Sequence, residues 1–578
     1  MDPKDCLSER NRLTEELYDN RYDINLYLAR AIAYENLGFP DLAAGDAYRA
    51  LRLTDEVQDE SGDYHEHALD ALKQHRRRRE PKGLPNGANA VGEDAEQSAE
   101  NTHLDTKWDG VDVAEGSDAD ELIKEVHQFC LECYHLLSRC LVKCGCLRSA
   151  YDFCLRGLSA SHDSTFAQRK DAILSQHRRR KRDEDSTWDE SSFNPKLDLP
   201  DLGSVRKELY PWNTHEPDRF SDATLQFLNN EVSKVAPSCE VHAVSLPLLT
   251  EDGLHQTTND HEQPTIKQLG LFAKEDITPG AKVLNESSIL TANNRLHYPL
   301  CDACSSELPQ LDATDPLLAC DECDDIVFCS QVCFDLAMQT YHPAVCGRDV
   351  EAIGKDTDLL EATNALYLLL LGRVIALAET QEIHPLELKE VRYIWGDFMT
   401  PDVTYLHSDS SSTFSTARHL PFSFTYNIVL PLHVLEKMDI DIYASLPKYD
   451  TWILNTLYAK FRGTASARLS KQDGRPEVCA VHPIWCLANH SCDPNVTWEW
   501  GGNITFTARE ERAEWNAKDK RKGGIRTGEE ILSHYCDIEM GVRDRRQWAV
   551  GALGGMCVCE RCVWEETHLE MASSIGTE

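Results

Sequence analysis

The sequence has no long apolar run, no apolar segment at its start and no excess of basic residues. None of its uninterrupted apolar stretches reaches the roughly 18 residues that a membrane-spanning helix needs. The opening Met1-Asp2-Pro3-Lys4-Asp5 lacks the apolar core of a signal peptide. We therefore expect a protein that is neither secreted nor membrane-spanning and that is located in the nucleus, the cytoplasm or both.

Basic residues are outnumbered, because 59 Lys and Arg stand against 97 Asp and Glu and the net charge is -38. Phosphate contacts need clustered Lys and Arg, so this balance argues against direct binding of nucleic acid. An acidic surface attracts basic partners instead, lysine-rich protein tails among them.

The length of 578 residues is enough for roughly three or four domains. The chain also has 22 cysteines. Without an export signal, metal ligation and buried free thiols explain so many cysteines better than disulfides do.

Two segments near the N-terminus share a helical pattern around Gly38 and Gly145. Small and large apolar residues recur at helical spacing, and each glycine stands where one helix must end and the chain must turn. The pattern resembles a tetratricopeptide repeat, and it predicts one helical repeat in 1–75 and another in 121–175. The intervening acidic segment 76–120 is too polar to order itself, and we expect a disordered insertion there. The matched positions of the first repeat are Tyr27, Ala31, Tyr34, Ala43, Ala47 and Ala50.

The pair Cys130 and Cys133 has the spacing of zinc ligands, but no second pair completes a site. We expect these cysteines to be buried within helices, where free Cys behaves as a small apolar residue. We expect the segment 176–235 to be a linker. Its basic run 177–182 fits either a nuclear-localisation patch or a solvated stretch of linker.

Eight Cys and His residues follow one another in four short pairs over 46 residues, which leaves little room for an apolar core. Soft ligands with this spacing predict two tetrahedral structural zinc ions. The pattern resembles a MYND zinc finger, whose ligands interleave between two ions and which can bind proline-containing peptides. The ligands are Cys301, Cys304, Cys320, Cys323, Cys329, Cys333, His342 and Cys346.

Three further elements follow in a fixed order near the end of the chain. They are the run Asn489-His490-Ser491-Cys492-Asp493-Pro494-Asn495, then Glu529-Glu530-Ile531 leading to Tyr535, and then a cluster of Cys557, Cys559 and Cys562. Together they resemble the catalytic end of a SET-domain lysine methyltransferase. The resemblance implies that Cys492 completes a third zinc site with the three C-terminal cysteines.

The N-terminal part of such a domain is found in 266–286, where alternating apolar residues on either side of Pro279-Gly280 predict a short hairpin. A finger inserted in a split SET domain is the order of the SET- and MYND-domain methyltransferases, and N-terminal repeats are a variant seen among fungal relatives. The expected fold is α+β and multidomain, with a β-rich split SET domain. The remaining expected parts are the SET N-terminal part in 236–300, the finger in 301–346, a helical insert in 347–477, the SET C-terminal part in 478–545, and a post-SET segment and tail in 546–578.

The resemblance implies transfer of a methyl group from S-adenosylmethionine to a lysine of a histone or of another protein. Tyr535 would align the amine and the methyl group, while Gly270, Leu271, Asn489, His490 and Tyr535 would hold the cofactor. Such a reaction needs a neutral amine in a narrow, water-poor channel, because the ordinary pKa of lysine is about 10.4. The repeats and the finger would recruit protein partners.

Two positions depart from the family's pattern. The first glycine of the usual Gly-x-Gly is Gln268, and Gly555 stands where an aromatic residue often stacks on the adenine. Phe272 or Trp548 are candidates to compensate. The departures leave an alternative, a catalytically inactive adaptor that binds protein partners. A zinc-dependent transcription factor fits the finger but not the negative charge.

Overall fold

The computed structural model mixes helices and antiparallel sheets, which confirms the expected α+β composition. The chain forms two compact units, one of residues 1–143 and 147–199 and the other of residues 144–146 and 200–578. The residues that the structure describes are 3–79, 118–185, 187–206, 208–250, 253–254, 265–295, 299–309, 318–323, 326–355, 357–395, 419–513, 515 and 522–575.

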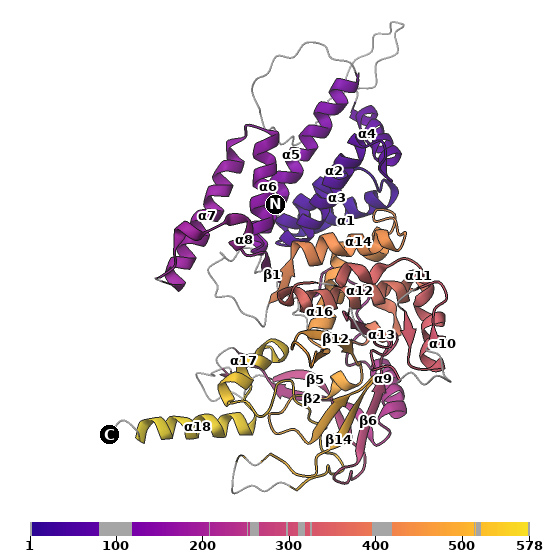
Figure 1. Ribbon diagram of the computed structural model, residues 1–578, viewed down its shortest axis with the longest axis vertical. Helices are drawn as coiled ribbons and strands as arrows, with labels where there is room; N and C mark the ends of the chain where they lie inside the picture. Colours follow the sequence, from indigo (N-terminus) through magenta and orange to yellow (C-terminus); the bar gives the residue numbers. More distant parts are fainter. Residues whose placement is uncertain are drawn as a thin grey trace, which may run out of the picture. The chain divides into compact units, whose positions relative to one another are not determined.

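Unit 1 is built from helices (Figure 1). They are α1 (Pro3–Asp19), α2 (Ile24–Asn36), α3 (Pro40–Gln58), α4 (His65–Arg79), α5 (Asp118–Cys144), α6 (Leu147–Ala160), α7 (Ser164–Glu184), the 3-10 turn η1 (Glu190–Ser192) and α8 (Pro195–Asp198). The chain turns between α2 and α3 at Gly38, and between α5 and α6 at Gly145, with φ of 79° and 84°. Only glycine adopts this conformation without strain, so both predicted turns have a physical cause.

Small side chains let α2 and α3 pack closely, since Ala31, Ala43 and Ala47 are fully buried. A buried ion pair crosses the same interface, where Arg30 donates two hydrogen bonds of 2.7 Å to the carboxylate of Asp46. A buried charge of this kind is tolerated only when it is fully paired.

Most of the cysteines of α5 and α6 are buried thiols, as the helical pattern predicted, and Cys130 is partly buried. Cys133, Cys140 and Cys154 have no exposed surface. Burial raises the pKa of Cys140 to about 12, which keeps the thiol protonated and unsuited to metal binding. Within the described part of the chain, no group of metal-binding side chains includes Cys130 or Cys133.

Unit 2 contains several small antiparallel sheets. One sheet has the order β13-β14-β6, another β11-β12-β7, and the remaining strands form the pairs β2-β5, β1-β10, β3-β4 and β8-β9. The strands are β1 (Leu202–Arg206), β2 (Cys239–Pro247), β3 (Leu249–Thr250), β4 (Gly253–Leu254), β5 (Thr265–Ala273), β6 (Lys282–Ser287), β7 (Thr291–Asn293), β8 (Leu318–Ala319), β9 (Val327–Phe328), β10 (His419–Ser423), β11 (Ala465–Leu469), β12 (Pro476–Val481), β13 (Val496–Trp500) and β14 (Asn503–Ala508).

The helices of unit 2 flank these sheets (Figure 1). They are α9 (Asp222–Val235), α10 (Gln331–Thr340), α11 (His342–Val345), α12 (Ala362–Thr380), α13 (Lys389–Arg392), α14 (Leu430–Lys437), α15 (Leu446–Tyr449), α16 (Thr451–Arg462), α17 (Val542–Leu553) and α18 (Glu560–Ile575). Shorter turns are η2 (Val350–Gly354), η3 (Leu359–Glu361), η4 (Pro385–Glu387), η7 (Trp485–Leu487) and the π-helical η6 (Thr425–Val429).

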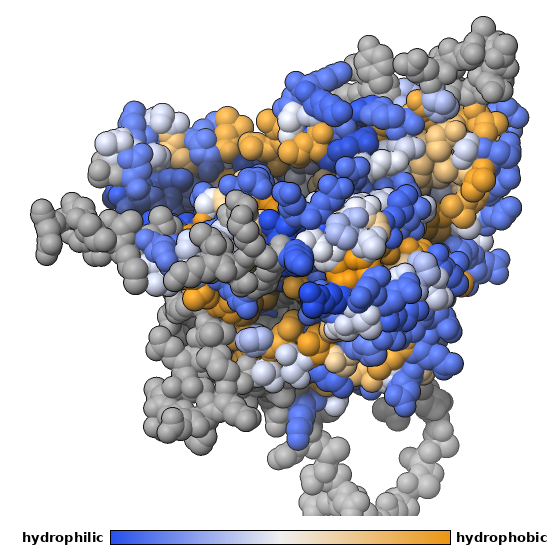
Figure 2. Space-filling view, turned by 90° about the horizontal axis from the view of Figure 1, so that it is seen from below, coloured by the Kyte–Doolittle hydropathy of each residue, from blue (hydrophilic) through white to orange (hydrophobic). Residues whose placement is uncertain are grey.

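One apolar core joins α9 to the strands that matter for the site. Leu228 and Val232 of α9 belong to the same buried cluster as Leu271 of β5, Leu284 of β6 and Phe506 of β14. The surface seen in Figure 2 is largely hydrophilic, with apolar residues in patches between polar ones.

Among the described residues, one helical stretch is long and apolar enough to cross a membrane by composition. It is Leu359–Thr380, and it includes α12. Most of α12 is buried within unit 2, Leu370, Leu371 and Val374 completely. Burial in a protein core accounts for its apolar character.

The predicted hairpin across Pro279-Gly280 is wrong. The turn exists, with Gly280 at φ 77°, but β5 pairs with β2 and β6 pairs with β14. A turn reverses the chain without requiring its flanking strands to pair, and both strands pair with other strands instead.

The predicted boundaries also differ from the elements. The segment 176–235, expected as a linker, contains the end of α7 together with β1 and α9. The helices α4 and α5 extend into 76–120 from its two ends, and the remainder of that predicted insertion, 80–117, lies outside the described residues.

Candidate functional site

The seven cysteines and one histidine of the expected finger, 301–346, gather into two groups of four, each able to hold a metal ion. One group is Cys301, Cys304, Cys329 and Cys333, and the other is Cys320, Cys323, His342 and Cys346. The pairs therefore alternate between the two groups along the chain.

The distances within each group suit zinc. The Sγ atoms of Cys304 and Cys329 are 3.7 Å apart, as are those of Cys320 and Cys346. Two sulfurs on a tetrahedral zinc with bonds of 2.3 Å lie about 3.8 Å apart. All four positions in each group are taken by protein ligands, so the clusters fit structural rather than hydrolytic zinc.

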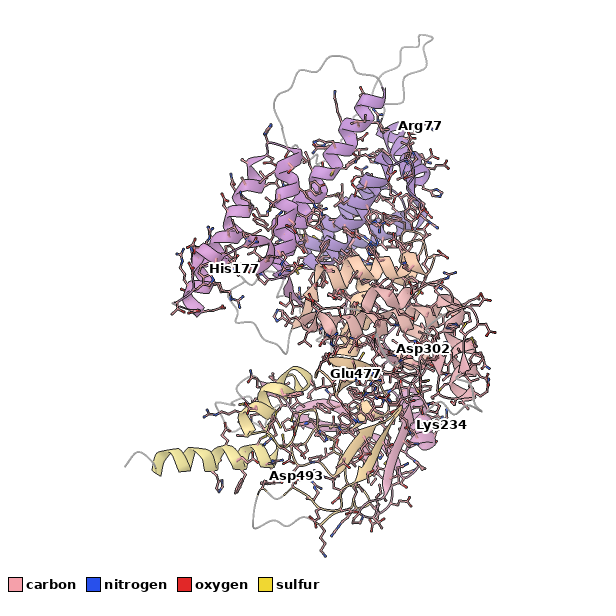
Figure 3. The ribbon with its side chains drawn as sticks, viewed as in Figure 1. Arg77, His177, Lys234, Asp302, Glu477 and Asp493 are labelled. Atoms are coloured by element: carbon pink, nitrogen blue, oxygen red, sulfur yellow. The ribbon has the colours of Figure 1, made fainter. Side chains whose placement is uncertain are left out.

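The finger is attached to α12 by a buried cluster of polar groups. Arg373 donates to the backbone oxygen of Asp302 at 2.8 Å and stacks over the ring of Tyr341 at 3.7 Å. The hydroxyl of Tyr341 donates to the Asp302 carboxylate at 2.5 Å. Asp302 is labelled in Figure 3. A cavity of about 140 Å³ lies beside this cluster, between the finger and α12, and is separate from the site described below.

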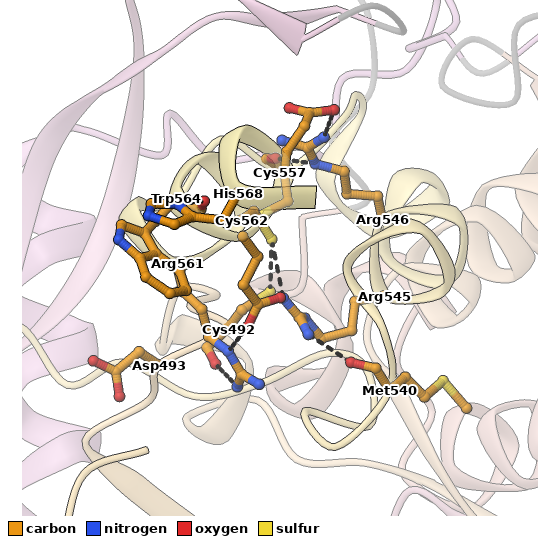
Figure 4. A network of polar contacts seen from close by, with 12 residues as sticks. Cys492, Asp493, Met540, Arg545, Arg546, Cys557, Arg561, Cys562, Trp564 and His568 are labelled. Carbon is orange, nitrogen blue, oxygen red and sulfur yellow. Dashed lines mark hydrogen bonds and ion pairs between the residues drawn. The ribbon is translucent and has the colours of Figure 1, made fainter. Parts of the chain in front are cut away.

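A third cysteine group joins two distant parts of the sequence. The Sγ atoms of Cys492, Cys557, Cys559 and Cys562 lie within 4.8 Å of one another, and those of Cys492 and Cys562 are 3.4 Å apart (Figure 4). A fully cysteine-ligated zinc would hold α18 onto the segment that carries Asn489 and His490.

Three arginines surround this cysteine group (Figure 4). Arg545 lies 3.7 Å from the sulfur of Cys562, Arg546 donates to the backbone oxygen of Cys557 at 2.9 Å, and Arg561 donates to that of Cys492 at 2.8 Å. Four thiolates on one zinc carry a net charge of two minus, which nearby guanidinium groups stabilise.

His490 connects the cysteine group to Tyr535. The backbone N–H of Tyr535 donates to Nδ1 of His490 at 3.0 Å, so Nδ1 is unprotonated and Nε2 carries the proton of the neutral ring. Burial lowers the pKa of His490 to about 4, which favours the neutral form. The Nε2–H then donates to the sulfur of Cys492, 3.3 Å away.

Sequence reasoning missed Cys536, which lies next to Tyr535. His490, Cys492 and Cys536 are close enough together to suggest another metal group. The tautomer of His490 excludes that role for Nε2, because a nitrogen that carries a proton has no lone pair for a metal. The adjacency of Cys536 to Tyr535 was the only signal for it in the sequence.

The segments 489–495 and 530–535 cross each other through backbone hydrogen bonds. Ser533 donates to the oxygen of Asn489 at 2.9 Å, and Ser491 donates to that of Ser533 at 2.8 Å. The side chain of Asn495 donates to the oxygen of Glu530 at 2.7 Å and accepts from the N–H of Leu532 at 2.8 Å. The side chain of Asn495 thus has a structural role in the crossing.

Tyr535 and Asn489 are held by backbone oxygens. The Tyr535 hydroxyl donates to the oxygen of Ala488 at 3.0 Å. The amide of Asn489 donates to the oxygen of Leu269 at 3.0 Å and to Oε1 of Glu530 at 2.6 Å. The crossing therefore lies against β5.

The two faces of β5 differ in character. Leu269, Leu271 and Ala273 point into the apolar core, so the alternation of a strand places Gln268, Gly270 and Phe272 on the opposite face. Leu271, which the resemblance assigns to the cofactor, lies within β5 and its side chain is buried.

Gly270 lies where two polar side chains approach the strand. A Cβ atom at this position would come within 2.5 Å of Oε1 of Glu530 and 3.3 Å of Nδ2 of Asn489. Residue 270 therefore has to be glycine if these groups keep their places. The ring of Phe272 stacks edge-on with His242 of β2 at 5.5 Å.

The structure also shows the surroundings of Gln268 and Gly555, the two positions that depart from the pattern of the resembled family. Oε1 of Gln268 accepts a hydrogen bond of 2.8 Å from Arg219. Gly555 follows the end of α17, where Gly554 has a φ of 72°. Phe272 shares a face with Gly270, whereas Trp548 is an exposed residue of α17.

No family model matches the chain, and no curated protein matches it either.

Proposed function

We propose that this protein is a protein-lysine N-methyltransferase that uses S-adenosylmethionine. The observation that carries the proposal is the crossing of 489–495 with 530–535 against β5. It brings Tyr535, Asn489 and the Gly270 face of β5 to one place beside a cysteine group able to hold zinc. These are the residues that the resemblance to SET-domain enzymes assigns to the cofactor and to catalysis.

The residues at this place suit the proposed cofactor. The face of β5 around Gly270 has no side chain of its own at that position, and Asn489 and Glu530 offer an amide and a carboxylate there. Phe272 offers an aromatic ring on the same face. When bound, S-adenosylmethionine supplies a methyl group made electrophilic by the sulfonium.

Tyr535 would position the target amine. Its hydroxyl proton is directed to the oxygen of Ala488, and the phenol oxygen would accept a hydrogen bond from an N–H of the lysine. A water-poor channel lowers the pKa of the amine and favours the neutral, nucleophilic form. Alignment of the two reactants would then supply most of the rate enhancement.

The three cysteine groups complete the proposal as structural zinc sites. Two ions would fold the finger, and the third would hold α18 against the crossing. The helical repeats of unit 1 and the finger would recruit a lysine-containing protein, for which the net charge of -38 favours a basic one such as a histone.

Calorimetric titration of the zinc-loaded protein with S-adenosylmethionine tests the proposal. We expect the wild type to bind, and Asn489→Ala to weaken binding at least tenfold because it removes a hydrogen-bonding amide, a loss of about 1.4 kcal/mol or more. Asn230→Ala on the exposed surface of α9 is the matched control and should bind like the wild type.

Tyr535→Phe separates binding from transfer. It should keep the affinity for S-adenosylmethionine and lower tritium transfer to a histone mixture or a cell extract at least a hundredfold. A wild type that shows no binding at millimolar cofactor would rule out the enzyme.

One observation favours the alternative, an inactive adaptor of repeats and finger. Gln268 adds a side chain to the face of β5 where the family has a glycine. The adaptor would retain binding of protein partners without binding the cofactor, so the same titration distinguishes the two functions.

A further inference from the structure

The polar face of β5 carries opposite charges at its two ends. Near Gln268 the guanidinium of Arg219 donates to the side-chain amide and lies over the ring of Trp395 at 5.3 Å. Near Gly270 the carboxylate of Glu530 accepts from Asn489. Residues 268 and 270 are separated by two steps along a strand, or about 7 Å. The face is therefore a short dipole, positive at 268 and negative at 270.

Arg219 fixes the orientation of the Gln268 amide. A guanidinium has donors only, so the atom 2.8 Å from Nη1 of Arg219 has to be the amide oxygen of Gln268. The amide nitrogen, with two N–H donors, then points elsewhere. Within the described part of the chain it has no hydrogen-bond partner, and Gln268 is only half-buried. The face thus presents an unused pair of donors at its positive end.

A zwitterionic α-amino acid matches this arrangement. Its carboxylate and its ammonium are attached to a single carbon, so both groups can be contacted within the span from residue 268 to residue 270. The carboxylate is attracted by Arg219 and repelled by Glu530. The ammonium is attracted by Glu530 and repelled by Arg219. S-adenosylmethionine ends in such a group.

We propose that Gln268, oriented by Arg219, binds the carboxylate of the amino-acid end of S-adenosylmethionine. This inference rests on the proposed function. Gln268, which replaces the first glycine of the family's pattern, would then contribute to cofactor binding rather than weaken it. Arg219 is a positioning residue, and it lies N-terminal to 236–300, the expected N-terminal part of the SET domain.

A comparison of two ligands tests the contact. The probes are S-adenosylmethionine and decarboxylated S-adenosylmethionine, each titrated calorimetrically into the full-length, zinc-loaded protein. Gln268→Ala should weaken the binding of S-adenosylmethionine at least tenfold, about 1.4 kcal/mol. It should weaken the binding of the decarboxylated ligand less than twofold, because that ligand has no carboxylate. The matched control is Gln226→Ala on the exposed surface of α9.

Variants of Arg219 test the positioning role. Arg219→Ala should weaken the binding of S-adenosylmethionine three- to tenfold. The loss in the double variant Arg219→Ala with Gln268→Ala should be smaller than the two single losses combined, because part of the effect of Arg219 acts through Gln268. Arg219→Lys keeps a charge and a donor, and it should recover part of the loss. Zinc content and the thermal unfolding midpoint show whether each variant is folded.

The outcomes separate this inference from the proposed function. If Gln268→Ala weakens the binding of both ligands equally, or of neither, the proposed carboxylate contact is wrong, while the proposed methyltransferase function is unaffected. If the wild type binds neither ligand at millimolar concentration, the proposed function fails, and this inference fails with it.

Discussion

Glu286 of β6 is a buried carboxylate that accepts hydrogen bonds from two backbone groups. It is 4% exposed and accepts from the N–H groups of Ile484 and Trp485 at 3.0 and 2.8 Å. Burial raises its pKa to about 7, although the two hydrogen bonds oppose the shift. Through these bonds Glu286 holds η7, which lies just before Asn489 in the chain.

A pKa raised in the folded state makes stability fall as the pH rises. Folding favours the protonated form of Glu286, so its stabilising contribution is complete below the unfolded pKa, about 4.3, and is lost as the pH passes 7. Between pH 6 and pH 8 the wild type should lose about 1.4 kcal/mol of unfolding free energy relative to Glu286→Gln, which cannot ionise. Urea unfolding at the two pH values measures this difference, and a difference that does not change with pH would contradict it.

At the scale of elements, the third cysteine group joins α18 to the crossing that carries Tyr535. Cys492 belongs to this group from one side, and His490 is hydrogen-bonded both to its sulfur and to the backbone N–H of Tyr535. The position of Tyr535 should therefore depend on the metal.

Cys492→Ser should reduce bound zinc from three ions per chain to two and increase hydrogen exchange at the Tyr535 amide. Metal analysis and exchange mass spectrometry measure the two effects. Cys130→Ser is the matched control, since Cys130 belongs to no metal-binding group in the described part of the chain, and it should retain three ions. Three ions in Cys492→Ser would show that this cysteine is not a ligand.

Elements also show where sequence patterns reach their limit. The turns at Gly38 and Gly145 could be predicted because helix periodicity and glycine at a helix end are local properties. The pairing of β5 with β2 could not, because a strand pattern states which face is buried but not which strand lies beside it. The predicted β5-β6 hairpin failed for this reason.

At the scale of the whole molecule, the net charge of -38 sets how partners approach. Long-range attraction between exposed charges is screened over about 8 Å at physiological salt. Binding of a lysine-rich histone-tail peptide should therefore weaken at least fivefold between 50 and 300 mM salt, mainly through slower association. Stopped-flow fluorescence at the two salt concentrations measures the association rate. A rate independent of salt would contradict the role of charge.

By itself the sequence determined the α+β class, the acidic character of the protein and which Cys and His residues of 301–346 could bind metal. These follow from local spacing and composition, since paired ligands a few residues apart reach the same metal ion in almost any fold. The order of the three C-terminal elements also pointed to Asn489, His490 and Tyr535 as residues of one site.

The tertiary structure alone decided which distant groups meet. It places Glu530 against Gly270, Arg219 against Gln268 and Cys536 beside the third cysteine group. It also directs the side chain of Leu271 into the core and fixes the tautomer of His490 through the backbone of Tyr535. These contacts join residues that are distant in the chain, or depend on which face of a strand is buried, and both are set by how the whole core packs.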